Sequence, residues 1–318
     1  MPKVLITGGA GCIGQAIAQY FKRKNFAVVT YDIIEPKEVF GQHVMGTIMY
    51  TDELYQAMLG CDYVIHLAAM LGVARTEANR MECLNINING TKNVFDASVY
   101  AGIKKIIFAS SSEVYGEPEK NPIVETDPVR PKSVYAVSKL AGEEYARAYK
   151  QQFNLDYSII RFFNVYGPDQ VGEFVIPRFV RSVLRGQSPT VYGNGEQTRC
   201  YCHVDDGAQG VYLALMNEAA NGEVFNIGND KTAISVKALA EKIIALSGKK
   251  LELKFVALED SDRSKEREIY QRTASIAKAS QVLGYQPVIG LEEGIKDVIN
   301  KDSIKDGWSD EKDKYHSA

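Results

Sequence analysis

The chain has 318 residues, of which 45% are hydrophobic and 24% are charged. This composition is typical of a globular protein, and the length predicts two domains or one large α/β domain with an appendage. Thirty-seven basic and 40 acidic side chains give a net charge of −3, which argues against a general nucleic-acid binder and still allows a small anionic ligand.

Apolar runs and cysteines bear on where the protein works. The apolar run at the N-terminus is too short for a signal peptide, and the later apolar stretch at residues 64–74 is broken by His66 and Gly72. The cysteines are five, an odd number, and form no Cys-x-x-Cys pair. We therefore expect a cytoplasmic protein with free thiols, without a metal and without membrane contact.

The first two thirds of the chain alternate short apolar runs with longer amphipathic stretches. The apolar runs, rich in Val, Ile and Tyr, predict β-strands at residues 3–7, 27–31, 63–67, 104–110 and 157–161. The amphipathic stretches predict α-helices at residues 13–24, 87–100 and 135–152. Strands separated by helices of this length predict right-handed βαβ units and a parallel sheet.

The sequence changes character after about residue 165. Further helices are predicted at residues 174–186, 205–216, 235–247 and 274–283. Gly193-Asn194-Gly195 predicts a tight turn, and the polar residues 302–318 predict a frayed tail. We expect Asp205 and Asp206 to cap the helix that they begin, and His203 to have a structural role.

A glycine-rich loop joins the first predicted strand to the first predicted helix, with the spacing Gly8-x-x-Gly11-x-x-Gly14. The spacing alone is a weak signal, because a tight turn without a ligand would also explain it. Between a strand and a helix, however, such glycines let the backbone approach a pyrophosphate. Asp32 ends the second strand, where an acid accepts hydrogen bonds from a ribose and repels a 2′-phosphate, so we expect NAD rather than NADP. Cys12 is interpreted as a spacer.

Tyr135 and Lys139 are four residues apart, which places a phenol and an ammonium on one face of a helix. Two other pairs with this spacing have no polar partner nearby and are interpreted as surface pairs: Tyr20/Lys24 and Tyr100/Lys104. Tyr135 differs because the serine-rich residues 110–116 end a strand upstream, at the sheet edge that binds ligands. A tyrosine with a pKa of ~10 needs roughly 4 kcal/mol of help to act as a base at neutral pH, which an ammonium and a nicotinamide cation would supply.

Several motifs occur in a fixed order: residues 7–14, Asp32, Asn87-x-x-Gly90-Thr91, residues 110–116, Tyr135-x-x-x-Lys139 and residues 161–168 (RFFNVYGP). Through them the chain resembles, over roughly residues 3–300, an extended short-chain dehydrogenase/reductase of the NAD-dependent nucleotide-sugar epimerase/dehydratase family. The resemblance implies a Rossmann-type doubly wound parallel sheet with a smaller mixed α/β C-terminal substrate domain. It also implies NAD as cofactor, a nucleoside-diphosphate sugar as substrate, and a homodimer packed through the helices at 87–100 and 135–152.

The resemblance also implies how the chain is divided between these domains. Residues 1–168 would bind NAD, and residues 200–226 would return to that domain. Residues 169–199 and 227–302 would bind the nucleotide sugar, and residues 303–318 would form a polar tail.

Residue roles follow from the same resemblance. Tyr135 would be the base, Lys139 its electrostatic partner, Ser111 the substrate-orienting hydroxyl and Glu113 a further catalytic group. The implied cofactor contacts are Gly8, Gly11, Cys12, Ile13, Gly14, Asp32, Leu67, Ala68, Ala69, Asn87, Tyr135 and Lys139. The implied substrate contacts are Ser112, Asn164, Val175, Arg199, Arg272 and either Arg263 or Arg267. Thr47 departs from the pattern, because family members often carry an adenine-binding acid there.

The reactions of this family begin with oxidation of the sugar at C4, and the fate of the 4-keto sugar distinguishes them. We predict a 4-epimerase, on the abundance of that activity in the family. Glu113 and Arg272 resemble the pattern of UDP-glucuronate decarboxylases, which is the alternative. Ser112 stands where dehydratases carry an acid, which disfavours dehydration. A net C4 dehydrogenase and a non-catalytic NAD-sensing regulator are further alternatives, although such regulators typically lose the Tyr/Lys pair.

Overall fold

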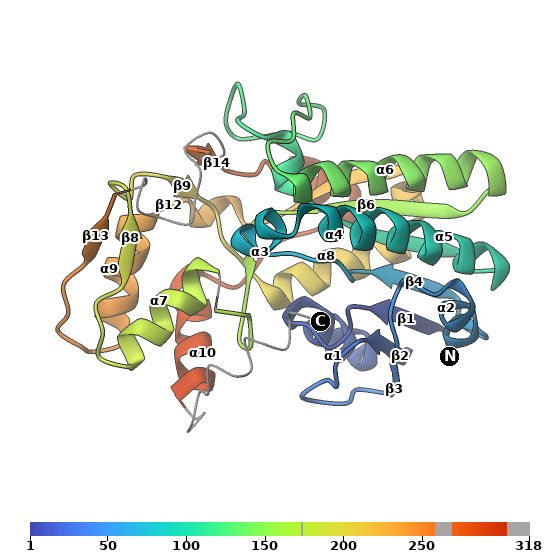
Figure 1. Ribbon diagram of the computed structural model, residues 1–318, viewed down its shortest axis with the longest axis horizontal. Helices are drawn as coiled ribbons and strands as arrows, with labels where there is room; N and C mark the ends of the chain where they lie inside the picture. The colour runs from blue at the N-terminus through green and yellow to red at the C-terminus, as the bar shows by residue number, and fades with distance from the viewer. Residues whose placement is uncertain (173, 258–268, 304–318) are drawn as a thin grey trace.

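A seven-stranded parallel sheet forms the centre of the protein in the computed structural model, which describes residues 1–172, 174–257 and 269–303 (Figure 1). Its strands are β1 (Lys3–Thr7), β2 (Ala27–Asp32), β3 (Gln42–Met45), β4 (Tyr63–His66), β5 (Lys105–Ser111), β6 (Asp156–Phe162) and β11 (Glu223–Ile227). Their order across the sheet is β11-β6-β5-β4-β1-β2-β3. This confirms the predicted parallel α/β sheet.

Helices cover both faces of this sheet. One face carries α1 (Cys12–Arg23) and α8 (Val204–Met216), and the other carries α2 (Thr51–Met58), α5 (Gly90–Tyr100) and α6 (Val134–Phe153). Val4 and Ile6 pack in the core on the first face and Leu5 in the core on the second, because successive strand residues point to opposite faces. Burial on both faces explains why the strands read as continuous apolar runs.

The strand order reverses between β1 and β4, which both lie at the centre of the sheet. Crossovers run to opposite sides of this point, so the loops after the two strands separate and leave a crevice at their carboxyl ends. The glycine loop follows β1 directly, and the loop at 67–72 follows β4. The short helices α3 (Val73–Ala78) and α4 (Arg80–Leu84) continue from that second loop.

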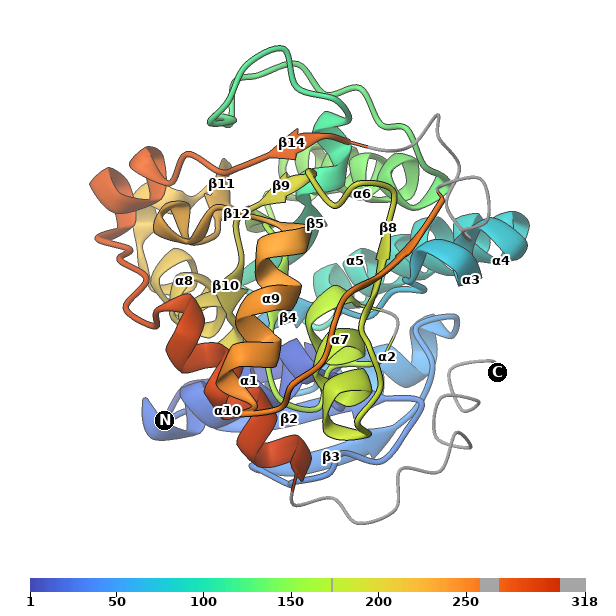
Figure 2. The same ribbon diagram turned by 90° about the vertical axis from the view of Figure 1, so that its left-hand side faces the viewer.

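A smaller mixed α/β unit stands beside the crevice, on the left of Figure 1 and facing the viewer in Figure 2. Its helices are α7 (Val175–Leu184), α9 (Val236–Leu246) and α10 (Leu291–Ser303). Their buried side chains form a separate hydrophobic core, which includes Phe179, Leu239 and Ile295. Its strands are β8 (Thr190–Tyr192), β9 (Thr198–Arg199), β12 (Ile234–Ser235), β13 (Lys254–Val256) and β14 (Gln271–Arg272).

The chain crosses between the two units more than once. After the short pair formed by β7 (Val165–Tyr166) and β10 (Cys202–His203), α8 packs against α1 and β11 adds to the edge of the large sheet beside β6. These returning elements join the two units around the crevice.

Two predicted helices differ from the structure. The helix predicted at 87–100 begins with a π-helical segment (η1, Asn85–Asn89) before α5. The helix predicted at 274–283 is wrong in its first residues, because Ala274 forms a parallel bridge with Ile123. The helical residues are 277–283, of which Ala279–Leu283 (η7) form a π-helix. Pairing with a distant segment overrides the local helical pattern there.

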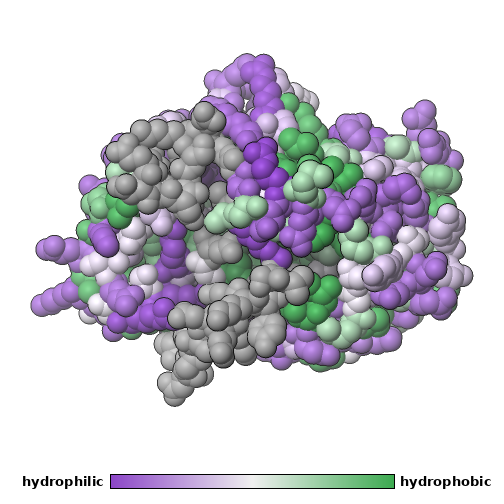
Figure 3. Space-filling model, in the orientation of Figure 1, coloured by the Kyte–Doolittle hydropathy of each residue, from purple (hydrophilic) through white to green (hydrophobic). Residues whose placement is uncertain are grey.

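The surface is largely hydrophilic, as the composition of the chain predicts. Hydrophilic side chains cover much of the face in Figure 3, with hydrophobic ones scattered among them. Among the described residues, no helix combines the length and the hydropathy needed to cross a membrane. Nor does the described part of the chain bring three His, Cys, Asp or Glu side chains together in a way that suits a metal ion.

Candidate active site

The glycine loop turns tightly from β1 into α1. Gly8 has a φ of 70°, and its N–H donates to the carbonyl of Tyr31 on β2 at 2.9 Å. A Cβ on Gly14 would lie 2.2 Å from the Gly8 carbonyl oxygen, so close packing of helix on loop requires glycine there. A Cβ on Gly11 would meet only that oxygen, at 3.4 Å, so the backbone at Gly11 is open to a ligand. The loop therefore fits the diphosphate of a dinucleotide such as NAD.

Asp32 lies beside the glycine loop at the end of β2. Its Oδ2 accepts from the N–H of Ala10 at 2.9 Å, and its Oδ1 accepts from the N–H of Ile33 at 2.7 Å. Burial raises the pKa of Asp32, and these backbone donors oppose the rise. The carboxylate is thus fixed next to the loop, where the ribose of a dinucleotide is expected.

The other predicted cofactor residues near the glycine loop lie either on the wall of a cavity or packed against neighbouring segments. Three of them line the cavity described below: Ile13, Leu67 and Ala69. Ala68 packs against the loop, since its nitrogen is 2.7 Å from the place of a Cβ on Gly8. Cys12 donates its S–H to the carbonyl of Pro168 at 3.3 Å and so contacts the segment after β7.

Asn87 lies behind the cavity wall and not on it. Its Oδ1 accepts from the N–H of Met70 at 2.7 Å, and its Nδ2 donates to the Met70 carbonyl and to Ser138 Oγ, both at 3.0 Å. The residue is 2% exposed. These contacts make Asn87 a support that joins the loop after β4 to α6.

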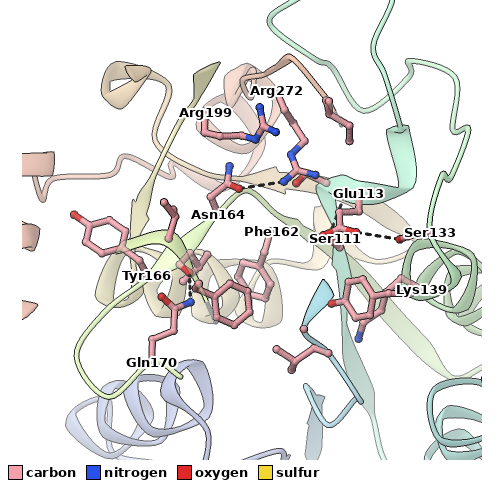
Figure 4. Close-up of a pocket in the computed structure, with 18 of the residues that line it drawn as sticks. Ser111, Glu113, Ser133, Lys139, Phe162, Asn164, Tyr166, Gln170, Arg199 and Arg272 are labelled. Atoms are coloured by element: carbon pink, nitrogen blue, oxygen red, sulfur yellow. Dashed lines mark hydrogen bonds between the residues drawn. The ribbon is translucent and has the colours of Figure 1, made fainter. Parts of the chain in front are cut away.

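A cavity of about 350 Å³ lies between the carboxyl ends of β5 and β6 and the smaller unit (Figure 4). The predicted catalytic and substrate residues that line it are Ser111, Ser112, Glu113, Tyr135, Lys139, Asn164, Val175, Arg199 and Arg272. They come from segments as far apart as β5 and β14, so the fold gathers them at one place. Arg263 and Arg267 lie outside the described residues.

Tyr135 and Lys139 stand on the first turns of α6. The helix begins because Ser133 caps it, accepting from the N–H of Ala136 at 3.1 Å. Lys139 Nζ lies 5.7 Å from the centroid of the Tyr135 ring and 5.3 Å from that of Phe108. One helical turn thus holds the ammonium beside the phenol.

Burial controls the protonation of these two groups. Burial, followed by the charge of Glu113, raises the pKa of Tyr135, and a hydrogen bond with Ser111 opposes this rise. Burial lowers the pKa of Lys139 to about 8. Burial, with the charge of Lys139, lowers the pKa of the neighbouring His66 to about 3, so that imidazole is neutral. The raised pKa keeps the phenol protonated at neutral pH, and its ionisation needs a further positive charge.

The two other Tyr/Lys pairs lie outside the cavity lining. Lys24 lies over the ring of Tyr20 at 5.5 Å. Tyr100 is 71% exposed, and Lys104 pairs with Asp62 at 2.7 Å. Tyr100 is exposed as predicted for a surface pair, whereas the expectation that these pairs have no polar partner is wrong for Lys104.

Ser111 and Glu113 form the right-hand wall of the cavity in Figure 4. Ser111 ends β5, and its Oγ accepts from the N–H of Glu113 at 3.2 Å, which starts a short 3₁₀ helix (η2, Ser112–Tyr115). Glu113 Oε2 in turn accepts from the hydroxyl of Ser133 at 3.1 Å. Sequence reasoning missed Ser133 as a cavity residue, although a serine directly before a helix is a capping signal.

Two arginines mark the opposite end of the cavity. Arg199 on β9 and Arg272 on β14 are direct partners in a parallel strand pair, and Figure 4 shows them near Asn164 and away from Lys139. Asn164 donates to the carbonyl of Cys200 at 2.9 Å and accepts from Arg272 Nη2 at 3.2 Å. The buried Nε of Arg272 has no hydrogen-bond partner among the described residues. A diphosphate at this end would meet charge-assisted donors.

Other cavity residues were also missed by sequence reasoning. The guanidinium of Arg178 lies 4.8 Å from the ring centroid of Tyr192, and both residues line the cavity. Gln197 is 4% exposed, and its Oε1 has no partner in the described part of the chain. Tyr192 and Gln197 flank the predicted Gly-Asn-Gly turn, so that turn could have indicated that residues beside it line the cavity.

The acidic pair at the start of α8 does not cap the helix, so that prediction is wrong. The cap is His203, whose Nδ1 accepts from the N–H of Asp205 at 3.3 Å. Asp206 instead accepts from the N–H groups of Val288 and Ile289 at 3.0 and 3.1 Å, and so holds a segment distant in sequence. His203 is 3% exposed and lies outside the cavity lining, in keeping with the structural role expected for it.

A buried ion pair lies beneath the site. Glu143 on α6 accepts from Arg161 on β6 through Nε at 2.9 Å and Nη2 at 2.7 Å, and from the hydroxyl of Ser110 on β5 at 2.6 Å. Glu143 is 0% exposed and Arg161 4% exposed. The pair ties α6 to the two strands whose ends form the cavity floor.

The glycine loop lies at the point where the strand order of the parallel sheet reverses, and the Tyr/Lys pair lies on α6, which packs against β5. This combination defines a dinucleotide-dependent oxidoreductase of the short-chain dehydrogenase/reductase type. The NAD dependent epimerase/dehydratase family matches residues 4–228, and the chain belongs to this family. It is an NAD-dependent enzyme of the extended type that acts on nucleotide sugars.

Named relatives and solved structures match nearly the whole chain. A putative UDP-glucose 4-epimerase of Methanocaldococcus jannaschii is 36% identical, over 93% of this chain and 97% of the relative. A UDP-N-acetyl-alpha-D-glucosaminuronate decarboxylase of Bacillus cytotoxicus is 33% identical, over 93% and 96%. The structure of UDP-glucose 4-epimerase with UDP-glucose from Thermotoga maritima has a TM-score of 0.86 at 29% identity, over 94% of this chain and 98% of that one.

Proposed function

We propose that this protein is a 4-epimerase of nucleoside-diphosphate sugars. The observation that carries the proposal is the lining of one cavity, which contains the Tyr135–Lys139 pair together with Arg199 and Arg272. Figure 4 shows the two arginines away from Lys139. A substrate whose anionic diphosphate meets the arginines would place its sugar beside the phenol. Similarity to 4-epimerases across 93% of the chain supports the same substrate class.

Each end of the cavity has a distinct task in this proposal. Arg199, Arg272 and Asn164 bind the diphosphate, and Ser111 hydrogen-bonds the sugar 4-hydroxyl so that its proton faces Tyr135. The Tyr135 phenolate takes that proton, and the Lys139 ammonium stabilises the phenolate. NAD would supply the hydride acceptor and donor for C4. Hydride addition to the other face of the 4-keto sugar would give the C4 epimer.

The protonation of Tyr135 ties the base to the cofactor. Burial and Glu113 keep its pKa above the usual tyrosine range. A cationic nicotinamide next to the phenol would lower that pKa and switch the base on. The enzyme would then remove a proton only when the hydride acceptor is in place.

Decarboxylation of a UDP-uronate is the second candidate. Glu113 and Arg272 both line the cavity, and these two residues resemble the pattern of UDP-glucuronate decarboxylases. The relative from Bacillus cytotoxicus is named a decarboxylase of a different UDP-uronate, UDP-N-acetyl-alpha-D-glucosaminuronate. In this variant of the reaction a C6 carboxylate makes the 4-keto sugar a β-keto acid, which loses carbon dioxide.

One assay separates these candidates. The NAD-loaded protein is incubated with UDP-glucose, UDP-N-acetylglucosamine, UDP-glucuronate and GDP- and dTDP-sugars, and the products are identified by mass spectrometry and NMR. An isomer of unchanged mass supports the 4-epimerase, and loss of carbon dioxide from the uronate supports the decarboxylase. Accumulation of an oxidised sugar with NADH would identify a net dehydrogenase.

The Tyr135→Phe variant tests whether the site is catalytic at all. We expect it to lose at least about 1,000-fold in kcat, because the substitution removes the group that takes the proton from the sugar hydroxyl. Its NAD content serves as the control, since the substitution removes one hydroxyl. Wild-type turnover by this variant would contradict the assignment of Tyr135, and a wild type that converts no nucleotide sugar would favour an NAD-sensing regulator.

We also propose that two copies of the chain pack through α5 and α6. Both helices carry large apolar side chains at the surface: Tyr100 is 71% exposed, Val137 45% and Phe153 53%. Analytical ultracentrifugation of the wild type and of a Val137→Glu variant tests this. A monomeric wild type would contradict the dimer.

A further inference from the structure

Ser133 takes part in two hydrogen bonds that serve different purposes. It precedes α6, two residues before Tyr135, and accepts from the N–H of Ala136 at 3.1 Å as the helix cap. Its hydroxyl donates to Glu113 Oε2 at 3.1 Å. A hydroxyl can accept and donate at once, so neither contact excludes the other. Ser133 also lines the cavity, so this second bond lies at the site.

The partner of that second bond belongs to the site. Glu113 lies on η2, two residues after Ser111, and its own N–H donates to Ser111 Oγ at 3.2 Å. Both side chains line the cavity. Within the described residues, Oε2 of Glu113 is bonded to Ser133, and Oε1 has no hydrogen-bond partner. Oε1 is therefore available to a hydroxyl of a ligand in the cavity.

These contacts form a closed circuit around the sugar end of the cavity. The circuit starts at Ser111, whose hydroxyl faces the Tyr135 phenol. It continues through the hydrogen bond from the Glu113 N–H to Ser111 and through the Glu113 carboxylate to Ser133, which precedes the helix that carries Tyr135. We propose that Ser133 is a positioning residue, whose hydroxyl holds the Glu113 carboxylate beside Tyr135 so that its free oxygen binds a sugar hydroxyl. That the bound hydroxyl belongs to a sugar rests on the proposed function. That Ser133 holds the Glu113 carboxylate rests on the hydrogen bonds given above.

The position of the Glu113 charge affects the pKa of Tyr135, which can be measured. The groups that face the phenol are Glu113 from η2, Cys83 from α4, Ser111 from β5 and Lys139 from α6. Burial raises the pKa of Tyr135 most, and Glu113 and then Cys83 raise it further. A carboxylate released from Ser133 would turn toward water, so its effect on the phenol would weaken and the pKa of Tyr135 would fall.

The chain contains a matched control for the capping role of Ser133. Ser235 caps α9 in the same way, accepting from the N–H of Ala238 at 3.2 Å, and it lies outside the cavity lining. Replacing either serine by alanine removes a cap of the same type. Only at Ser133 does the replacement also release a carboxylate.

The experiment uses the full chain loaded with NAD and compares Ser133→Ala, Ser133→Thr, Ser235→Ala and Glu113→Gln. For each variant we measure kcat and KM across pH, the NAD content and the midpoint of urea unfolding. We expect Ser133→Ala to lose about tenfold in the plateau value of kcat, since it loses a hydrogen bond to a charged group. The acid limb of its pH profile should move to lower pH, as in Glu113→Gln.

The conservative variant and the control variant are both expected to keep the kinetics of the wild type. Ser133→Thr keeps a hydroxyl, so its plateau and acid limb should match the wild type. Ser235→Ala should lower the unfolding midpoint through the loss of its cap alone, with unchanged kinetics. If Ser133→Ala keeps the wild-type acid limb and plateau, Ser133 is only a cap and the proposal is overturned.

A second measurement does not depend on turnover. The tyrosinate absorbance of each NAD-loaded variant is titrated, and that of the same variant carrying Tyr135→Phe is subtracted, which leaves the phenol of Tyr135. A lower pKa in Ser133→Ala and in Glu113→Gln, but not in Ser133→Thr, supports the positioning role even if no nucleotide sugar is converted. An unchanged pKa in Ser133→Ala overturns it while leaving the proposed reaction intact.

Discussion

Removing the charge of Lys139 should weaken the base that lies beside it. The ammonium is 5.7 Å from the centroid of the Tyr135 ring, and Lys139 is 4% exposed. At an effective dielectric constant of about 20, unit charges at this distance attract by about 3 kcal/mol. This corresponds to about 2 pH units in the pKa of Tyr135. We therefore expect Lys139→Met to lower kcat at neutral pH by about 100-fold.

The pH dependence provides a second expectation with a definite sign. Burial lowers the pKa of Lys139 to about 8, so the wild type loses the ammonium as the pH rises through that value. Its kcat should fall above a pH of about 8. Lys139→Arg keeps a positive charge at every accessible pH, so its activity should extend to higher pH than that of the wild type.

The assay for Lys139 measures initial rates from about pH 6 to about pH 10, with saturating NAD and nucleotide sugar. Saturation separates the effect on the base from any loss of cofactor affinity, and bound NAD is quantified in each sample. A Lys139→Met variant with full NAD content and more than about a tenth of the wild-type kcat would contradict the reasoning. So would a Lys139→Arg variant whose alkaline limb coincides with that of the wild type.

Two further predictions concern stability. Glu143→Gln should lower the free energy of unfolding by about 3 kcal/mol, because it leaves Arg161 buried without its counter-charge. Urea unfolding beside Glu144→Gln, an exposed neighbour, measures this, and equal losses in the two variants would refute it. Burial lowers the pKa of Lys105 from 10.5 to about 8, so the folded state binds fewer protons than the unfolded state in that range. The stability contributed by Lys105 should therefore rise between pH 8 and 10.5, and Lys105→Met should lack this rise in urea unfolding at both ends of the range.

The sheet and the cofactor loop could be predicted from the sequence because their signals are local. A strand buried on both faces is a short apolar run, and the glycines at 8, 11 and 14 lie close together where the first strand passes into the first helix. Tyr135 and Lys139 could be paired for the same reason, since one helical turn separates them. In each case the contacts that matter join residues close in sequence.

Contacts between distant segments account for what the sequence did not provide. Ala274 lies in a helical pattern but forms a bridge with Ile123, and Asp206 binds backbone groups more than 80 residues away rather than capping its own helix. Arg199 and Arg272 became neighbours only through the pairing of β9 with β14. No local pattern encodes which strand pairs with which, so such predictions needed the fold.

The buried pair beneath the site explains how local and distant features come together. Tyr135 is positioned by α6, and Ser111 by β5, so their meeting depends on how the helix lies on the sheet. Glu143, on α6, binds both Ser110 on β5 and Arg161 on β6. Ser110 is the residue directly before Ser111, so one buried carboxylate sets the register between the helix of the base and the strand of the orienting hydroxyl. A charge that costs free energy to bury is compensated here by fixed hydrogen bonds, and the alignment of Tyr135 with Ser111 follows from them.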